Sequence, residues 1–278
     1  MNENVHDILI ALRETKVAKT LWIDAICINQ DDPKKKAHQV ALMGAVYSSS
    51  IQTIIWLGLA SDGSDMGMEL VENVSSRDFE IQSMNMKVAG WKALYAIMRR
   101  PWWSRLWTIQ EVGLSKQAIV KCGGKEVDLS KFRELYKLHD QANRDTRKHL
   151  PPLFRSLFAS VSFGYVLGMW DTMVPEALGA EVGIEVWLTI LPFAQYTLVR
   201  DKLFALYNLS SLEDRRSIRI DYERPDRRVQ GSRGSSYQEM WDRCSANWKR
   251  QQVMELWSSV MGTRLVFPGP SREHVDFV

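Results

Sequence analysis

Two spacings of hydrophobic residues organise the first 58 positions of the chain. Within residues 3–14 apolar positions recur every three to four residues, which predicts an amphipathic helix. Residues 21–28 (LWIDAICI) are apolar almost without a break around Asp24, which predicts a strand buried on both faces. Asp32, followed by a proline, predicts the cap of a second helix, and residues 51–58 (IQTIIWLG) predict a second strand. This order indicates a βαβ unit and a parallel sheet covered on both faces.

The pattern that follows predicts helices around one β-hairpin. Helices are expected over residues 68–74 and 91–98, and a third is expected to start at Pro101 and run through Val112. The segment AIVKCGGKEV at 118–127 predicts a hairpin whose two glycines both adopt positive φ, and a further helix is expected to reach about residue 142.

We therefore expect three segments, of which the first two form one domain. Residues 1–142 form an α/β core, and residues 143–222 form a mainly helical extension that ends in a strand at SIRIDY (217–222). Residues 223–278 form a linker and an irregular tail, because charged residues mixed with Gly and Ser follow there without a clear hydrophobic period.

Composition narrows the class of protein. With 45% hydrophobic and 25% charged residues among 278, the chain has the profile of a soluble globular protein. A net charge of +3, with acids interleaved among the arginines of 213–228, gives no case for a nucleic-acid partner. Three distant cysteines predict no metal site and fit a reducing, cytoplasmic compartment. The apolar stretch 156–170 is shorter than the ~20 residues of a spanning helix, so no membrane span is expected.

Asp24 is the first candidate site residue, because an acid in a buried strand needs a partner or a function. Asn29, Gln30 and Asp31 follow where the strand is expected to end, and ligands of open parallel sheets bind beyond the carboxyl ends of strands. These four residues form either a polar site or only a locked turn in which Asp24 accepts hydrogen bonds from loop amides or a basic side chain. The basic run 34–36 either attracts an anion or is a solvated turn.

The second candidate is Glu111, in RPWWSRLWTIQEVG (100–113). On one continuous helix Trp103, Trp107 and Glu111 would share a face, with Glu111 in the last turn, where the helix dipole disfavours an anion. Burial against the indoles would raise its pKa, as suits an acid or base. The alternative is a glutamate at the rim of the apolar face, paired with an arginine. Arg105 and Gln110 would lie on other faces of the helix, and no nucleophile elbow, phosphate loop, Rossmann glycine pattern or zinc motif is present.

Taken together, these motifs resemble the fungal heterokaryon incompatibility (HET) domain. TLWIDAICINQDD, HQVALMGAVYSSS and IIWLG, followed by RPWWSRLWTIQEV and KCG, carry the resemblance over roughly residues 3–130. RDKLFALYNLSS at 200–211, which contains Asp201, resembles a later segment of that family. The family usually opens with a strand pair that this chain lacks, so one or two strands of the sheet are expected to be missing.

The resemblance implies a fold and a function. The fold would be a parallel sheet like those of the Toll/interleukin-receptor (TIR) and flavodoxin folds, flanked by helices. The function would be fungal self/non-self recognition, in which assembly with protein partners (further copies of the chain or another incompatibility protein) promotes programmed cell death without a cofactor.

Two alternatives stay open. Some members of the wider TIR group hydrolyse NAD through a glutamate, so Glu111 or Asp24 could be catalytic with NAD as substrate. The chain could also be a degenerate, non-functional HET fragment. Apart from these possible catalytic acids, we expect the following motif or binding residues: Asn29, Gln30, Asp31, Arg105, Trp107, Gln110 and Asp201.

Overall fold

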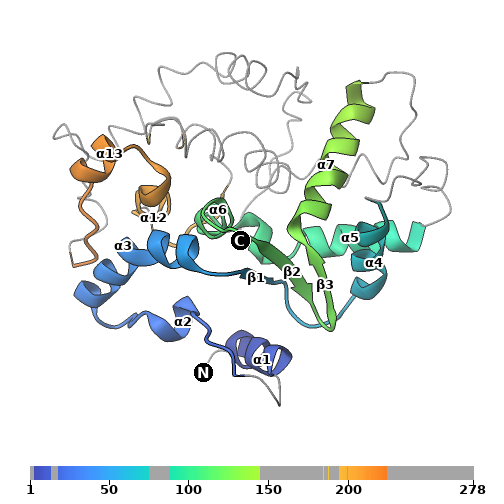
Figure 1. The fold of residues 1–278 in the computed structure, drawn as a ribbon, viewed down its shortest axis with the longest axis horizontal. Coiled ribbons are helices and arrows are strands. Elements are labelled where there is room, and N and C mark those ends of the chain that lie inside the picture. The colour runs from blue at the N-terminus through green and yellow to red at the C-terminus, as the bar shows by residue number, and fades with distance from the viewer. Residues whose placement is uncertain are drawn as a thin grey trace, which may run out of the picture.

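The computed structural model describes residues 3–13, 18–74, 88–144, 184, 187, 194–198 and 200–223 (Figure 1). The expected helical extension at 151–183, the apolar stretch 156–170 and nearly all of the expected tail lie outside these ranges. The described elements form a mixed α/β fold, in the order α1 Glu3–Leu12, α2 Asp24–Cys27, α3 Pro33–Ser49, β1 Thr53–Trp56, α4 Ser64–Val74, α5 Val88–Met98, η2 Pro101–Ser104, α6 Thr108–Gly113, β2 Ala118–Cys122, β3 Lys125–Asp128, α7 Leu129–Arg144, α12 Asp201–Phe204, η3 Tyr207–Leu209 and α13 Leu212–Ser217.

The strands form one mixed sheet in the order β1-β2-β3. β1 pairs in parallel with β2, in the register Thr53 with Ala118, and β2 pairs antiparallel with β3. The β2–β3 hairpin confirms the sequence prediction, except that only Gly123 has a positive φ, of 55°. β2, the parallel partner of β1, comes after α4, α5 and α6 in the sequence. The parallel pair is therefore not the βαβ unit predicted from residues 21–58.

The prediction of a strand over residues 21–28 is wrong. Residues 24–27 instead form the short helix α2, and of residues 18–32 only Ile28 is buried. The physical reason is Asp24: a strand buried on both faces would take its carboxylate out of water, whereas the turn leaves it partly hydrated. SIRIDY is not a strand either. Ser217 ends α13, and Ile218 is buried among the helices that pack beside the sheet.

The hydrophobic interior has two parts on either side of α6 (Figure 1). The sheet core joins β1, β2 and β3 with α4, α5 and α7. The helical core joins α3, α6, α12 and η3. The segment 101–113 serves both parts, since Trp102, Trp103 and Val112 enter the sheet core while Leu106 and Ile109 enter the helical core.

Residues 101–112 are nevertheless not the single helix predicted from sequence. η2 ends at Ser104, Arg105 is extended (φ −71°, ψ 137°), and α6 starts only at Thr108. At this break the backbone groups of Ser104 and Leu106 pair with Gln195, whereas a continuous helix would pair them with residues one turn away. The start at Pro101 is confirmed: Arg100 before it is extended (φ −63°, ψ 144°), as expected for a residue that precedes proline.

Arg100 fastens the loop after β1. Its guanidinium donates hydrogen bonds to the carbonyl oxygens of Leu57 (2.7 Å) and Leu59 (2.9 Å) and to the hydroxyl of Ser61 (2.9 Å). Gly58 between them has a φ of 104°, a conformation that favours glycine. Arg100 therefore holds the carboxyl end of β1 to the end of α5.

We expect Arg100→Ala to lower the free energy of unfolding by about 2 kcal/mol, because hydrogen bonds from a charged donor are lost and the Leu57 carbonyl is left unsatisfied. Urea denaturation measures this. The neighbouring variant Arg99→Ala is the control, since Arg99 is exposed and lies 5.6 Å from the centre of the Tyr95 ring, a contact that contributes about 0.5–1 kcal/mol at such sites. Equal losses in the two variants would contradict the role given to Arg100.

Candidate functional site

A pocket of about 640 Å³ opens between α2, α3, α12 and the start of α6, and we call it the α3–α12 pocket. It brings together five of the residues predicted from sequence, and its wall is completed by the segment 194–198 and by Tyr222. The predicted residues that line it are Asp24, Gln30, Arg105, Trp107 and Asp201. Its size lies within the range of small-molecule sites, roughly 300–1,000 Å³.

The position of the pocket corrects one expectation. No residue of β1, β2 or β3 lines it, so it is not at the carboxyl ends of the strands. At that edge the N–H of Gly123 donates to the carbonyl of Gly58 (2.9 Å), and Arg100 holds the adjoining loop. The pocket is lined instead by residues of α2, α3 and α12 and by Trp107, the residue before α6.

Arg105 is held in the pocket by backbone pairing with a distant segment. Gln195 pairs with it in a parallel bridge, in which the Gln195 N–H donates to Ser104 (2.7 Å) and the Leu106 N–H donates to Gln195 (2.9 Å). The Arg105 guanidinium lies 3.9 Å from the Asp24 carboxylate, and the two side chains are 44% and 46% exposed. Asp24 also accepts the N–H of Ala25 at 2.7 Å. Asp24 is thus paired with a basic side chain and a local amide, the arrangement expected for a locked turn.

Glu111 lies behind the pocket and does not line it. It is in the first turn of α6, not in the last turn of a longer helix, and the indole N–H of Trp102 donates to its carboxylate at 2.9 Å. Trp103 points into the sheet core and Trp107 lines the pocket, so the expected shared face does not exist. Burial raises the pKa of Glu111, while the charge of Arg105 and the Trp102 hydrogen bond oppose that rise.

Asp201 is the buried acid of the pocket, with 6% of its surface exposed. Its carboxylate accepts the N–H of Leu198 at 3.2 Å and the hydroxyl of Tyr222 at 3.3 Å. Burial raises the pKa of Asp201, and these hydrogen bonds together with the charge of Lys36 oppose the rise. Asp201 therefore holds the start of α12 to Tyr222.

Besides Glu111, three predicted site residues lie outside the pocket lining: Asn29, Asp31 and Gln110. Asn29 accepts the N–H of Asp31 at 3.1 Å, and both residues are exposed in a turn. Gln110 is fully buried, and neither atom of its amide has a hydrogen-bond partner among the described residues. The sequence interpretation placed Gln110 and Arg105 on other faces of one helix than Glu111, and nothing in the sequence indicated that Gln110 is buried.

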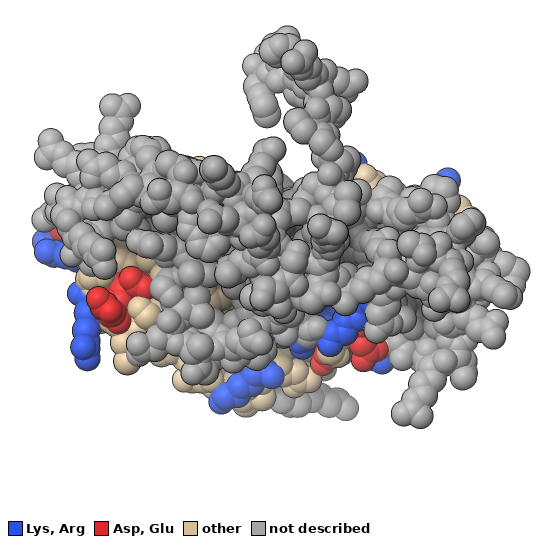
Figure 2. Space-filling view, turned by 90° about the horizontal axis from the view of Figure 1, so that it is seen from above, with Lys and Arg blue, Asp and Glu red and all other residues tan. Residues whose placement is uncertain are grey.

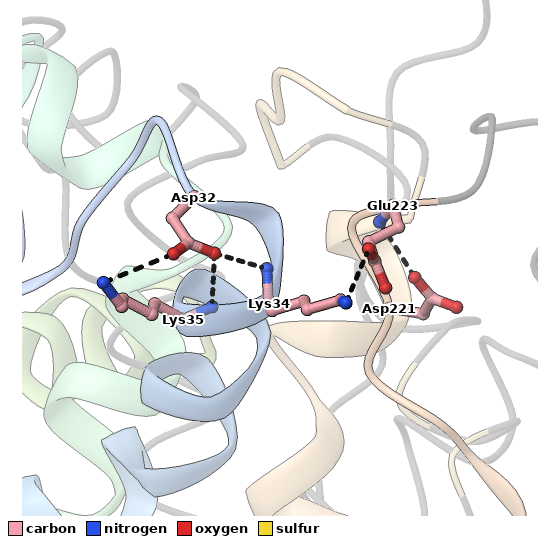
Figure 3. A network of polar contacts seen from close by, with 5 residues as sticks. All are labelled: Asp32, Lys34, Lys35, Asp221 and Glu223. Atoms are coloured by element: carbon pink, nitrogen blue, oxygen red, sulfur yellow. Dashed lines mark hydrogen bonds and ion pairs between the residues drawn. The ribbon is translucent and has the colours of Figure 1, made fainter.

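The three lysines at the start of α3 make different contacts. Asp32 caps the helix and accepts the N–H groups of Lys34 and Lys35, both at 3.1 Å, and the Lys35 N–H lowers the pKa of Asp32. Lys34 pairs with Glu223 at 3.7 Å across to the segment after α13 (Figure 3). Lys36 turns to the pocket, with its ammonium 4.6 Å from the centre of the Tyr222 ring.

Four further pocket residues were not among the site residues predicted from sequence: Lys36, Gln195, Tyr196 and Tyr222. No local spacing could have found them, because they meet only when residues 194–223 pack against α3. In Figure 2, some of the visible basic side chains lie next to acidic ones and others stand apart from them. Within the described residues, no three His, Cys, Asp or Glu side chains are grouped to hold a metal ion, and no helix is long and apolar enough to cross a membrane.

Comparison with known proteins agrees with the resemblance seen in the motifs. The family model described as heterokaryon incompatibility protein (HET) matches residues 1–111. Heterokaryon incompatibility protein 6, OR allele, of Neurospora crassa is 28% identical over 245 residues, an alignment that covers 73% of this chain and 36% of that protein. The chain thus corresponds to about a third of the length of this relative. No solved structure matches the chain.

Proposed function

We propose that the chain acts in fungal self/non-self recognition by promoting programmed cell death, because its residues 1–111 match the heterokaryon incompatibility (HET) family model. The observation that carries the proposal is the family match. It includes the turn at residues 28–30 (INQ), α3, β1 and the tryptophan-containing segment 100–107. The relative from Neurospora crassa is itself an incompatibility protein. A cytoplasmic location and a TIR- or flavodoxin-like arrangement of strands belong to the same proposal, and the parallel pair of β1 and β2 supports the latter.

The mechanism that we propose is assembly with protein partners, either further copies of the chain or another incompatibility protein. Two features of the described residues favour assembly over catalysis. Glu111 is held by Trp102 and does not line the pocket, and Asp24 is half exposed beside Arg105. A catalytic carboxyl group needs a fixed position against its substrate, and neither residue shows one. Large apolar side chains, such as Ile26 (55% exposed) and Ile51 (90% exposed), remain available to partners.

A second candidate function is hydrolysis of NAD or a related nucleotide. The observation that favours it is that Glu111 lies close enough to Arg105 and Asp24, two residues that line the pocket, for their charges to act on its carboxyl group. In this reaction water would replace nicotinamide at the ribosyl carbon, and a carboxylate would stabilise the positive charge that develops there. Glu111, which contributes no side chain to the pocket lining and accepts the hydrogen bond of Trp102, would have to gain access to the pocket for this chemistry.

One experiment separates these functions. The chain and its Glu111→Gln variant are expressed in yeast, and growth, protein level and cellular NAD are followed together. We expect growth arrest with unchanged NAD in both strains. NAD loss that the substitution abolishes would establish the hydrolase instead. Normal growth at full protein level would contradict both functions and favour a degenerate fragment.

A further inference from the structure

We propose that the α3–α12 pocket binds a small organic anion, with Arg105 and Lys36 holding a phosphate or carboxylate group and the aromatic wall holding a flat body. This inference concerns the pocket alone and does not depend on the proposed function. It rests on which polar groups of the pocket are already used by the protein and which are available.

Both acids of the pocket already have partners within the protein, Asp201 in a buried setting and Asp24 in a half-exposed one. Asp201 is buried, and its two carboxylate oxygens accept hydrogen bonds from Leu198 and Tyr222, one each. Asp24 uses one oxygen for the N–H of Ala25 and directs the other toward Arg105. Asp201 therefore has little acceptor capacity left for a cationic ligand, and Asp24 is the group that competes with a bound anion for Arg105.

The cations of the pocket have spare capacity. A guanidinium carries five N–H donors, and the ion pair of Arg105 with Asp24 is long, at 3.9 Å between nearest atoms, and half exposed. Lys36 forms no ion pair within 4.0 Å among the described residues, and its ammonium rests on the face of Tyr222. The Gln195 side chain accepts a hydrogen bond from Ser104 at 3.0 Å through its oxygen, which leaves its NH₂ group as a further donor. The pocket therefore offers donors and positive charge where an anion would enter.

The apolar part of the wall suits a flat body attached to that anion. Val40 and Met43 of α3 line the pocket together with Trp107 and Tyr196, and Tyr196 is 41% exposed. Aromatic side chains stack well on flat rings, and ligand pockets combine such walls with a few placed polar groups. An aryl phosphate or aryl carboxylate has both parts, whereas an inorganic ion has only the charge.

Calorimetric titration of the full chain at low salt tests the proposal with three probes: phenyl phosphate, benzoate and inorganic phosphate. We expect at least one aryl anion to bind more tightly than inorganic phosphate, and the tighter of the two identifies the charged group that the pocket prefers. Arg105→Gln should weaken binding about tenfold or more, since about 1.4 kcal/mol corresponds to a factor of ten. Asp24→Asn should tighten binding, because it removes the carboxylate that competes for Arg105.

Lys34→Gln is the matched control, because Lys34 is 77% exposed, pairs with Glu223 and does not line the pocket. Its affinity should equal that of the unmodified chain. Arg105→Lys, which keeps the charge, should retain part of the binding and covers the case in which Arg105→Gln does not fold. The proposal is overturned if none of the three probes binds, or if Lys34→Gln weakens binding as much as Arg105→Gln.

Discussion

Replacing Gly67 with alanine should lower the free energy of unfolding by about 1–3 kcal/mol, the usual cost of overpacking a core. Gly67 lies in α4 where it crosses α5, and a Cβ atom there would come 2.7 Å from Ile97 Cδ1, 2.9 Å from the Leu94 nitrogen and 3.0 Å from the Ala93 carbonyl carbon. Two of these atoms are backbone, so the helices themselves must separate. Urea denaturation of both proteins measures the loss.

Gly90→Ala is the control for this substitution, because it changes the same pair of helices from the other side. Gly90 belongs to α5, and a Cβ atom there would meet Leu70 at 3.5 Å and the Met66 carbonyl oxygen at 3.7 Å, which are ordinary contacts. Alanine is favoured over glycine within a helix by about 1 kcal/mol, so this variant should be more stable than the unmodified chain. A loss of similar size in both variants would show that the close approach at Gly67 does not decide the result.

The second large expected effect is on how the free energy of unfolding depends on pH, and it involves Glu111. Burial raises the pKa of Glu111 in the folded chain above its ordinary value of 4.5, so the ionised carboxylate is disfavoured by folding. Below the unfolded pKa the side chain is protonated in both states and this cost is absent; as the pH rises through the folded pKa, stability is lost. Glu111→Gln should therefore be more stable than the unmodified chain at pH 7, by about 1.4 kcal/mol for each pH unit by which the pKa is raised.

Urea denaturation of both proteins from pH 4 to pH 8 measures this difference, which should shrink toward pH 4. A glutamine at position 111 can still accept the Trp102 hydrogen bond, so that contact does not account for the change. Glu126→Gln is the control. Glu126 is 61% exposed and pairs with Lys121 at the surface, so its change should stay below about 1 kcal/mol. A Glu111→Gln variant less stable than the unmodified chain at pH 7 would mean that Arg105 compensates the buried charge in full.

Errors in the sequence prediction have a common origin. The apolar composition of 21–28 predicts a strand, yet the carboxylate of Asp24 keeps that segment at the surface. The helical spacing of Trp103, Trp107 and Glu111 predicts one helix over 101–112, yet the backbone beside Arg105 pairs with Gln195 and interrupts it. In both places a local pattern fits two structures, and contacts from distant residues select between them.

The sequence by itself determined the features that depend on neighbours a few residues apart. Asp32 and Pro33 start α3, Pro101 ends the helix before it, and Gly123 turns the hairpin, because capping and positive φ are local properties. Only the tertiary structure decided that β1 pairs with β2 and that Asp24, Arg105 and Asp201 line one pocket. Those arrangements depend on which surfaces pack together once the chain is compact, and sequence spacing carries no information on that choice.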